Sequence, residues 1–132
     1  MVTPTNPASL VLLVDDDRRT TFRLAQMLRE DGFEVEVATD GASAIARLGR
    51  KPPPAVLVTD FHLPHADGIA VARYARSRDP RVAVVLVTGY PQLAQAEQAQ
   101  SEPIEPPPQV VTKPLDYESF RRLLSDLSQD LR

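Results

Sequence analysis

The chain has 132 residues, of which 15 are basic and 18 are acidic, and its formal net charge is −3. This length predicts one domain that can bury a core without disulfides. The sequence contains no cysteine, which excludes thiol catalysis, zinc–thiolate sites and iron–sulfur clusters. The isoelectric point near 5.3 argues against direct binding to nucleic acid or to an anionic membrane.

Hydrophobic runs in the sequence are far shorter than the roughly 20 residues that a membrane span needs. Residues 1–9 are polar and do not have the pattern of a signal peptide, so we expect a flexible N-terminal tail and a cytoplasmic protein.

The first half of the chain alternates predicted strands with predicted helices. A continuous apolar run at residues 10–14 predicts a strand buried on both faces. Apolar residues at helical spacing from Phe22 to Leu28 predict a helix that ends near Gly32. Residues 33–38 alternate apolar and acidic side chains, as in a strand with one wetter face. Asp40 precedes a short helix, and residues 55–58 form a third buried run.

The second half continues the same alternation. Asp67 predicts the N-cap of a third helix, and residues 82–87 are the most strand-like segment of the chain. The fourth helix is expected to be short, because residues 91–100 have few apolar side chains and prolines follow at 103 and 106–108. Val110 and Val111 predict a short last strand, and Asp116 caps a final helix. Its apolar stripe consists of Phe120, Leu123, Leu124, Leu127 and Leu131.

Five strands alternating with five helices predict parallel β-α-β units, with helices on both faces of one sheet. Ligand sites of such sheets lie at the carboxyl ends of the strands. The polar residues that end or follow the predicted strands are Asp15, Asp16, Asp17, Asp60, Thr88 and Lys113.

Carboxylates that lie close together repel one another unless a cation neutralises them, and Mg²⁺ favours such oxygen ligands. A hydroxyl and an ammonium beside a carboxylate would stabilise the added charge of an acyl phosphate.

Four motifs, in this order and each closing a predicted strand, resemble the receiver domain of two-component response regulators. They are Val14-Asp15-Asp16, the segment from Val58 to Pro64, Val87-Thr88-Gly89 and Thr112-Lys113-Pro114. The resemblance extends from Leu10 to Leu131. It implies an α/β fold with a doubly wound five-stranded parallel sheet, flavodoxin-like (β/α)5, of strand order 2-1-3-4-5, within a receiver domain at residues 10–132.

The resemblance also implies a role for each site residue. Asp60 would be the phosphoacceptor. The ligands of Mg²⁺ or Mn²⁺ would be Asp15, Asp16, Asp60 and the backbone carbonyl of His62. Thr88 and Lys113 would bind the phosphoryl group, and His62 and Tyr90 are candidate modulators of its lifetime. Val110 stands where the family usually has an aromatic ring that changes rotamer on activation, so we expect Tyr90 to sense the change instead.

The partner implied by the resemblance is a sensor histidine kinase or a phosphotransfer domain, which would donate the phosphoryl group to Asp60. The change at Asp60 would alter the binding of an output partner that the sequence does not identify. The family also allows a homodimer through the face formed by the fourth helix, the fifth strand and the fifth helix. In this interpretation the chain is not an enzyme beyond supporting its own phosphorylation and slow dephosphorylation.

Two other interpretations stay open at this point. An aspartate-nucleophile phosphatase or hydrolase would show Asp-x-Asp-x-Thr after the first strand, whereas Arg19 stands at the threonine position. A pseudo-receiver that acts only as a binding module would be expected to lack Asp60 or Lys113, and both residues are present.

Overall fold

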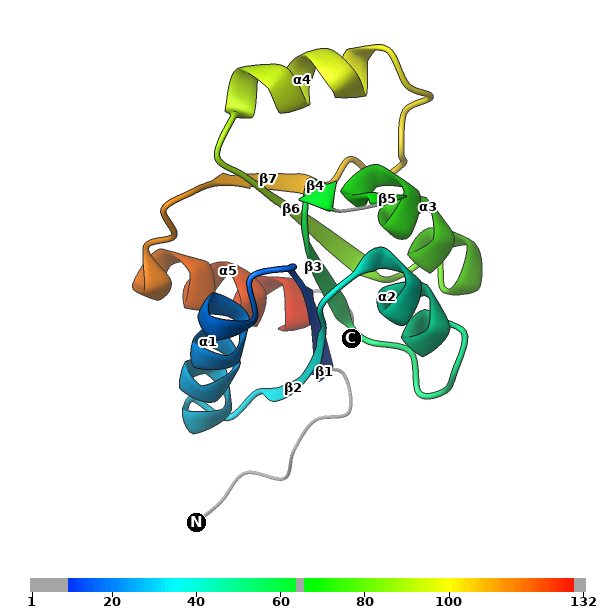
Figure 1. The fold of residues 1–132 in the computed structure, drawn as a ribbon. Coiled ribbons are helices and arrows are strands. Elements are labelled where there is room, and N and C mark those ends of the chain that lie inside the picture. The colour runs from blue at the N-terminus through cyan, green and yellow to red at the C-terminus, as the bar shows by residue number, and fades with distance from the viewer. Residues whose placement is uncertain (1–9, 64–65, 130–132) are drawn as a thin grey trace.

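The computed structural model describes residues 10–63 and 66–129, which form one parallel sheet with helices on both faces (Figure 1). The strands of this sheet lie in the order β2-β1-β3-β6-β7. They are β1 (Leu10–Val14), β2 (Glu34–Ala38), β3 (Val56–Asp60), β6 (Ala83–Thr88) and β7 (Gln109–Thr112). All five predicted strands and the predicted fold class are thereby confirmed. The predicted tail at residues 1–9 and Leu131 lie outside the described residues.

Two further strands, which the sequence did not predict, follow the end of β3. β4 (His62–Leu63) and β5 (Ala66–Asp67) form an antiparallel pair that is separate from the main sheet. Strands of two residues are too short to show a hydrophobic period, so no pattern in the sequence predicted them. The five strands of the main sheet keep the expected order 2-1-3-4-5, because the small pair lies outside it.

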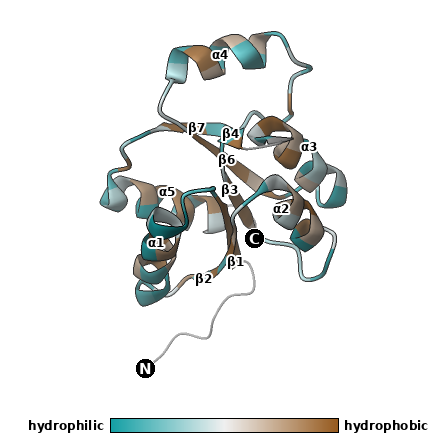
Figure 2. Ribbon diagram, viewed as in Figure 1, coloured by the Kyte–Doolittle hydropathy of each residue, from teal (hydrophilic) through white to brown (hydrophobic). Residues whose placement is uncertain are grey.

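The helices cover the two faces of the sheet in separate groups, and each group has its own hydrophobic core. They are α1 (Arg18–Glu30), α2 (Gly41–Leu48), α3 (Gly68–Arg78), α4 (Pro91–Ala99) and α5 (Tyr117–Gln129). On β1, Leu12 and Val14 pack with α2 and α3, whereas Val11 and Leu13 pack with α1 and α5. Figure 2 shows the resulting hydrophobic strands between more hydrophilic helix surfaces.

Aspartates begin four of the helices, because a carboxylate accepts the backbone N–H groups that a first helical turn leaves unpaired. The backbone N–H donors and their carboxylate acceptors are Thr20 to Asp17, Ser43 to Asp40, Ala70 to Asp67 and Ser119 to Asp116. The predicted caps at Asp67 and Asp116 are therefore confirmed.

Phe22 corrects one expectation from the sequence, because it does not belong to the buried stripe of α1. Its exposed fraction is 55%, whereas Thr21, Ala25 and Leu28 form the buried side of the helix. Phe22 follows Thr21 by one residue, which is about 100° around the helix, so it lies beside the buried stripe and not on it.

α4 is the least embedded helix of the described chain. It has nine residues, as expected for a short helix, and Ala94 is its only buried residue. The chain that follows α4 runs without regular structure to β7. None of the helices in the described part of the chain has the length and apolar character needed to cross a membrane.

Gly68 begins α3 against the backbone that carries Asp60. Its N–H donates to the carbonyl oxygen of Phe61 at 2.8 Å. A Cβ atom at this position would overlap the carbonyl oxygen of Asp60 and lie 3.0 Å from the Cα of Phe61. Because these neighbours are backbone atoms, they cannot move aside without displacing Asp60.

We predict that Gly68→Ala lowers the free energy of unfolding by about 1–3 kcal/mol, because it overpacks this contact. Gly89→Ala is the matched control, because no atom lies within 4 Å of the added Cβ there. The control should change stability by less than about 0.5 kcal/mol. Urea unfolding followed by circular dichroism measures both values, and equal stability of the two variants would contradict this account of Gly68.

Candidate functional site

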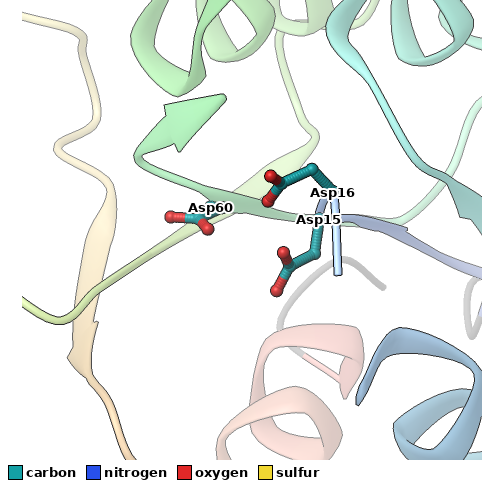
Figure 3. A group of neighbouring side chains, drawn as sticks. All are labelled: Asp15, Asp16 and Asp60. Carbon is teal, nitrogen blue, oxygen red and sulfur yellow. The ribbon is translucent and has the colours of Figure 1, made fainter. Parts of the chain in front are cut away.

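Three carboxylates meet at the carboxyl ends of β1 and β3 (Figure 3). β1 and β3 are parallel neighbours in which Val14 lies beside Thr59, so Asp15 and Asp60 come next at the same edge. One carboxylate oxygen from each of Asp15, Asp16 and Asp60 lies within 4.8 Å of the other two. The parallel register therefore brings together residues that are 45 positions apart in the sequence.

Lys113 supplies the positive charge of this site. Its backbone N–H donates to the carbonyl oxygen of Thr88 at 2.8 Å, which fixes the residue at the end of β7. Its Nζ donates to Asp60 Oδ2 at 3.0 Å and lies 3.7 Å from Asp15 Oδ2. One ammonium therefore bridges carboxylates from two different strands.

The pKa values at the site follow from burial and from these charges. Burial raises the pKa of Asp15, and the neighbouring carboxylate of Asp60 raises it further. The backbone N–H of Asp17 and the charge of Lys113 oppose this rise without cancelling it. Burial lowers the pKa of Lys113, but its hydrogen bond to Asp60 and the charges of Asp15 and Asp60 outweigh burial. The pKa of Lys113 therefore lies above the ordinary value, and Lys113 stays charged at neutral pH.

Asp17 has a different structural role from the two preceding aspartates, Asp15 and Asp16. Its side chain accepts the backbone N–H of Thr20 at 3.2 Å and the Thr20 hydroxyl at 2.9 Å. These hydrogen bonds hold the pKa of Asp17 below its usual value. Asp17 thus caps α1 and is not one of the three clustered carboxylates.

Thr88 is fully buried at the end of β6, next to the position that pairs with Asp60. The register places Asp60 beside Val87, so Thr88 is one residue beyond it. The Thr88 hydroxyl oxygen accepts the backbone N–H of Tyr90 at 2.9 Å. This contact uses a lone pair of the hydroxyl and not its proton, so the proton remains available to an acceptor.

His62 touches both the acidic site and α4. Its backbone N–H donates to Asp60 Oδ1 at 3.2 Å. Its ring lies edge-on to the ring of Tyr90, with 6.5 Å between centroids, and its Nε2 lies 3.5 Å from Glu97 Oε2. The sequence did not single out Glu97, because one acid among glutamines and alanines gives no signal of a long-range partner.

A cavity of about 710 Å³ opens beside the carboxylates and continues between α1 and the start of α5. Asp15, Asp60 and Lys113 line one part of it, and apolar side chains such as Leu24 and Met27 line another. The side chain of Asp60 is 12% exposed, so this carboxylate is partly accessible.

The fold and this site match one family of known proteins. The family model described as the response regulator receiver domain matches residues 11–125. The chain therefore belongs to this family and is a receiver domain of the two-component response regulators.

Individual relatives agree with this assignment. Response regulator receiver protein CpdR of Brucella abortus is 36% identical over 84 residues, which cover 64% of this chain and 69% of CpdR. Transcriptional regulatory protein TrcR of Mycobacterium tuberculosis is 41% identical over 78 residues, which cover 59% of this chain and 30% of TrcR.

Among solved structures, a response regulator receiver protein from Sinorhizobium medicae has a TM-score of 0.80 and 28% identity. The match covers 93% of this chain and 96% of that one. Because these relatives are regulators and receiver proteins, they do not favour the interpretation of the chain as an aspartate-nucleophile phosphatase or hydrolase. Most of the curated relatives are longer than the segment that matches this chain. The match covers 30% of TrcR and 46% of the photosynthetic apparatus regulatory protein RegA of Rhodobacter capsulatus.

We predict that Lys113→Gln lowers the free energy of unfolding by up to about 1 kcal/mol at low salt, because the carboxylates lose their cation. Added salt should reduce this difference by screening the repulsion. Because folding raises the pKa of Lys113, its contribution is complete below the pKa of an unfolded lysine, near 10.4, and is lost as pH rises through the folded pKa.

The matched control is Lys51→Gln, which changes the only other lysine of the sequence, an exposed one. Urea titrations at low and high salt measure both variants. A salt-independent loss at Lys113, equal to that at Lys51, would contradict the proposed charge balance.

Proposed function

We propose that Asp60 accepts a phosphoryl group from the phosphohistidine of a sensor kinase or phosphotransfer protein, and that the acyl phosphate changes which partners bind the domain. The observation that carries the proposal is the hydrogen bond from the Lys113 ammonium to a partly exposed carboxylate within the acidic cluster. A cytoplasmic location is part of the same proposal, since it is where such kinases present their phosphohistidine.

In the transfer, an oxygen of Asp60 forms a bond to phosphorus while the bond from phosphorus to the histidine nitrogen breaks. The leaving imidazole keeps the electron pair of that bond and takes up a proton. Lys113 moves its hydrogen bond from the free carboxylate to the added phosphoryl charge, and the hydroxyl of Thr88 donates to a phosphoryl oxygen. The protein thus contributes position and electrostatic stabilisation.

The donor set of the site fits Mg²⁺. Three carboxylates offer oxygen ligands within 4.8 Å of one another, and hard oxygen donors are the ligands that this ion prefers. Asp15, Asp16, Asp60 and the backbone carbonyl of His62 would hold the ion, and Mn²⁺ suits the same donors. When bound, the ion supplies positive charge that neutralises the carboxylates and the phosphoryl oxygens.

His62 and Tyr90 remain predicted modulators of the lifetime of the phosphoryl group. Their rings lie close to each other, and the backbone of His62 contacts Asp60. Rings at this place would limit the access of water to an acyl phosphate on Asp60.

Self-association through α4, β7 and α5 also stays a prediction. Tyr90 directly precedes α4, Leu93 lies in α4, and Val110 lies in β7. The exposed fraction of each of these side chains is above 40%. Exposed apolar side chains of this kind support a contact surface there.

We predict that Asp60→Asn abolishes labelling by acetyl phosphate in the presence of Mg²⁺ and leaves the protein folded. The amide removes the nucleophilic oxygen, and the loss of one negative charge relieves repulsion at the site. Asp17→Asn is the matched control, because Asp17 belongs to the acidic run but caps α1. Intact mass spectrometry should show the added phosphoryl group in the wild type and the control. Labelling of Asp60→Asn at the wild-type rate would remove the phosphoacceptor role from Asp60.

We predict that Asp16→Ala weakens Mg²⁺ binding by at least about tenfold, since a metal site is sensitive even to the loss of groups beyond its direct ligands. Isothermal calorimetry measures the affinity, because the sequence has no tryptophan for fluorescence. Glu34→Ala serves as the charge-matched control, because Glu34 lies beside Leu10 at the opposite end of the sheet. Equal Mg²⁺ affinity of the two variants would show that Asp16 does not hold the metal.

A further inference from the structure

α4 has few apolar contacts that could fix its position. Ala94 is its only buried residue, and the exposed fraction of Leu93 is 49%. The residue before the helix, Tyr90, makes no side-chain capping hydrogen bond. A helix with so little buried surface responds to small changes in its polar contacts, since local stability depends on such contacts.

The C-terminal half of α4 has a polar contact with the segment that follows Asp60. Glu97 Oε2 lies 3.5 Å from His62 Nε2, and both side chains are partly exposed, by 44% and 40%. His62 belongs to β4, the short strand directly after β3 and Asp60. This contact therefore connects two elements that are separate in the sequence.

The same residue also contacts the carboxylate of Asp60. The backbone N–H of His62 donates to Asp60 Oδ1 at 3.2 Å. Formation of an acyl phosphate replaces the charged carboxylate of Asp60 by one ester oxygen and one neutral carbonyl oxygen. The acceptor of this hydrogen bond therefore loses negative charge whichever oxygen is phosphorylated, and the hydrogen bond weakens. A change in the backbone of His62 moves its ring, and the ring contacts Glu97.

We propose that His62 passes the phosphorylation state of Asp60 to the C-terminal half of α4 through its contact with Glu97. The inference rests on the proposed function, because it needs Asp60 to be the phosphoacceptor. His62 acts here as a positioning residue: its backbone senses Asp60, and its side chain places α4.

A hydrogen bond between Thr88 and Tyr90 connects the site to the N-terminal end of α4. It allows the responses of the two ends of the helix to be compared. The backbone N–H of Tyr90 donates to the Thr88 hydroxyl at 2.9 Å, directly before the helix begins at Pro91. Loss of the contact at Glu97 should therefore affect residues 95–100 and spare the response at Tyr90.

The test compares amide hydrogen exchange of the free domain with that of the domain saturated with beryllofluoride and Mg²⁺, which imitate the phosphoryl group. In the wild type, exchange at residues 95–100 should differ between the two states by about two- to fivefold, the range set by one partly exposed polar contact. In Glu97→Ala this difference should disappear. A change in the NMR signals of Asp60 and Thr88 reports that beryllofluoride is bound.

Two further variants serve as controls. Glu97→Gln keeps an oxygen that can accept the imidazole N–H, so it should retain most of the response. Glu105→Gln removes one negative charge from an exposed position in the segment after α4, and it should respond as the wild type does.

The outcomes separate this inference from the proposed function. If beryllofluoride binds and residues 95–100 respond equally in the wild type and Glu97→Ala, the inference is wrong. It is also wrong if Glu97→Ala speeds exchange by the same factor in both states, because the contact is then only structural. If beryllofluoride does not bind at Asp60, the proposed function fails, and the inference fails with it.

Discussion

The parallel register of the sheet is the constraint on which the site depends. β1, β3, β6 and β7 are paired in parallel, so their carboxyl ends lie at one edge. This edge gathers carboxylates, a hydroxyl and an ammonium from four separate motifs. A slip of one residue in any pair would turn its site side chain to the opposite face of the sheet. β1, β3 and β6 place alternate apolar side chains in the two hydrophobic cores, so a slip would exchange the side chains that are packed in each core.

The ammonium of Lys113 lies where it can stabilise negative charge added at the carboxylate cluster. Lys113 contacts two of the three clustered carboxylates, and the raised pKa of Asp15 reflects its burial and the nearby charge of Asp60. Such a cluster is held in place by the fold against its own repulsion, and a divalent cation would relieve that repulsion.

The edge of the molecule around α4 is held largely by polar contacts. His62 contacts Glu97, and two arginines of α3 donate to the chain that follows α4. Arg73 donates to the carbonyl oxygen of Glu102, and Arg76 donates to that of Pro106 at 2.9 Å. Polar contacts of exposed groups are individually weak. This part of the fold can therefore change with little loss of hydrophobic packing, because Ala94 is the only residue of α4 in the core.

The sequence by itself determined the five main strands, the five helices and the acidic residues of the site. Buried strands, N-cap aspartates and motifs at strand ends are local patterns, and local patterns can be read along a chain. The tertiary structure alone decided the exposure of Phe22, the pair of β4 and β5, and the close approach of Gly68 to Asp60. It also decided the contact between His62 and Glu97. These features depend on distances between segments remote in sequence, which only the packing of helices against the sheet sets.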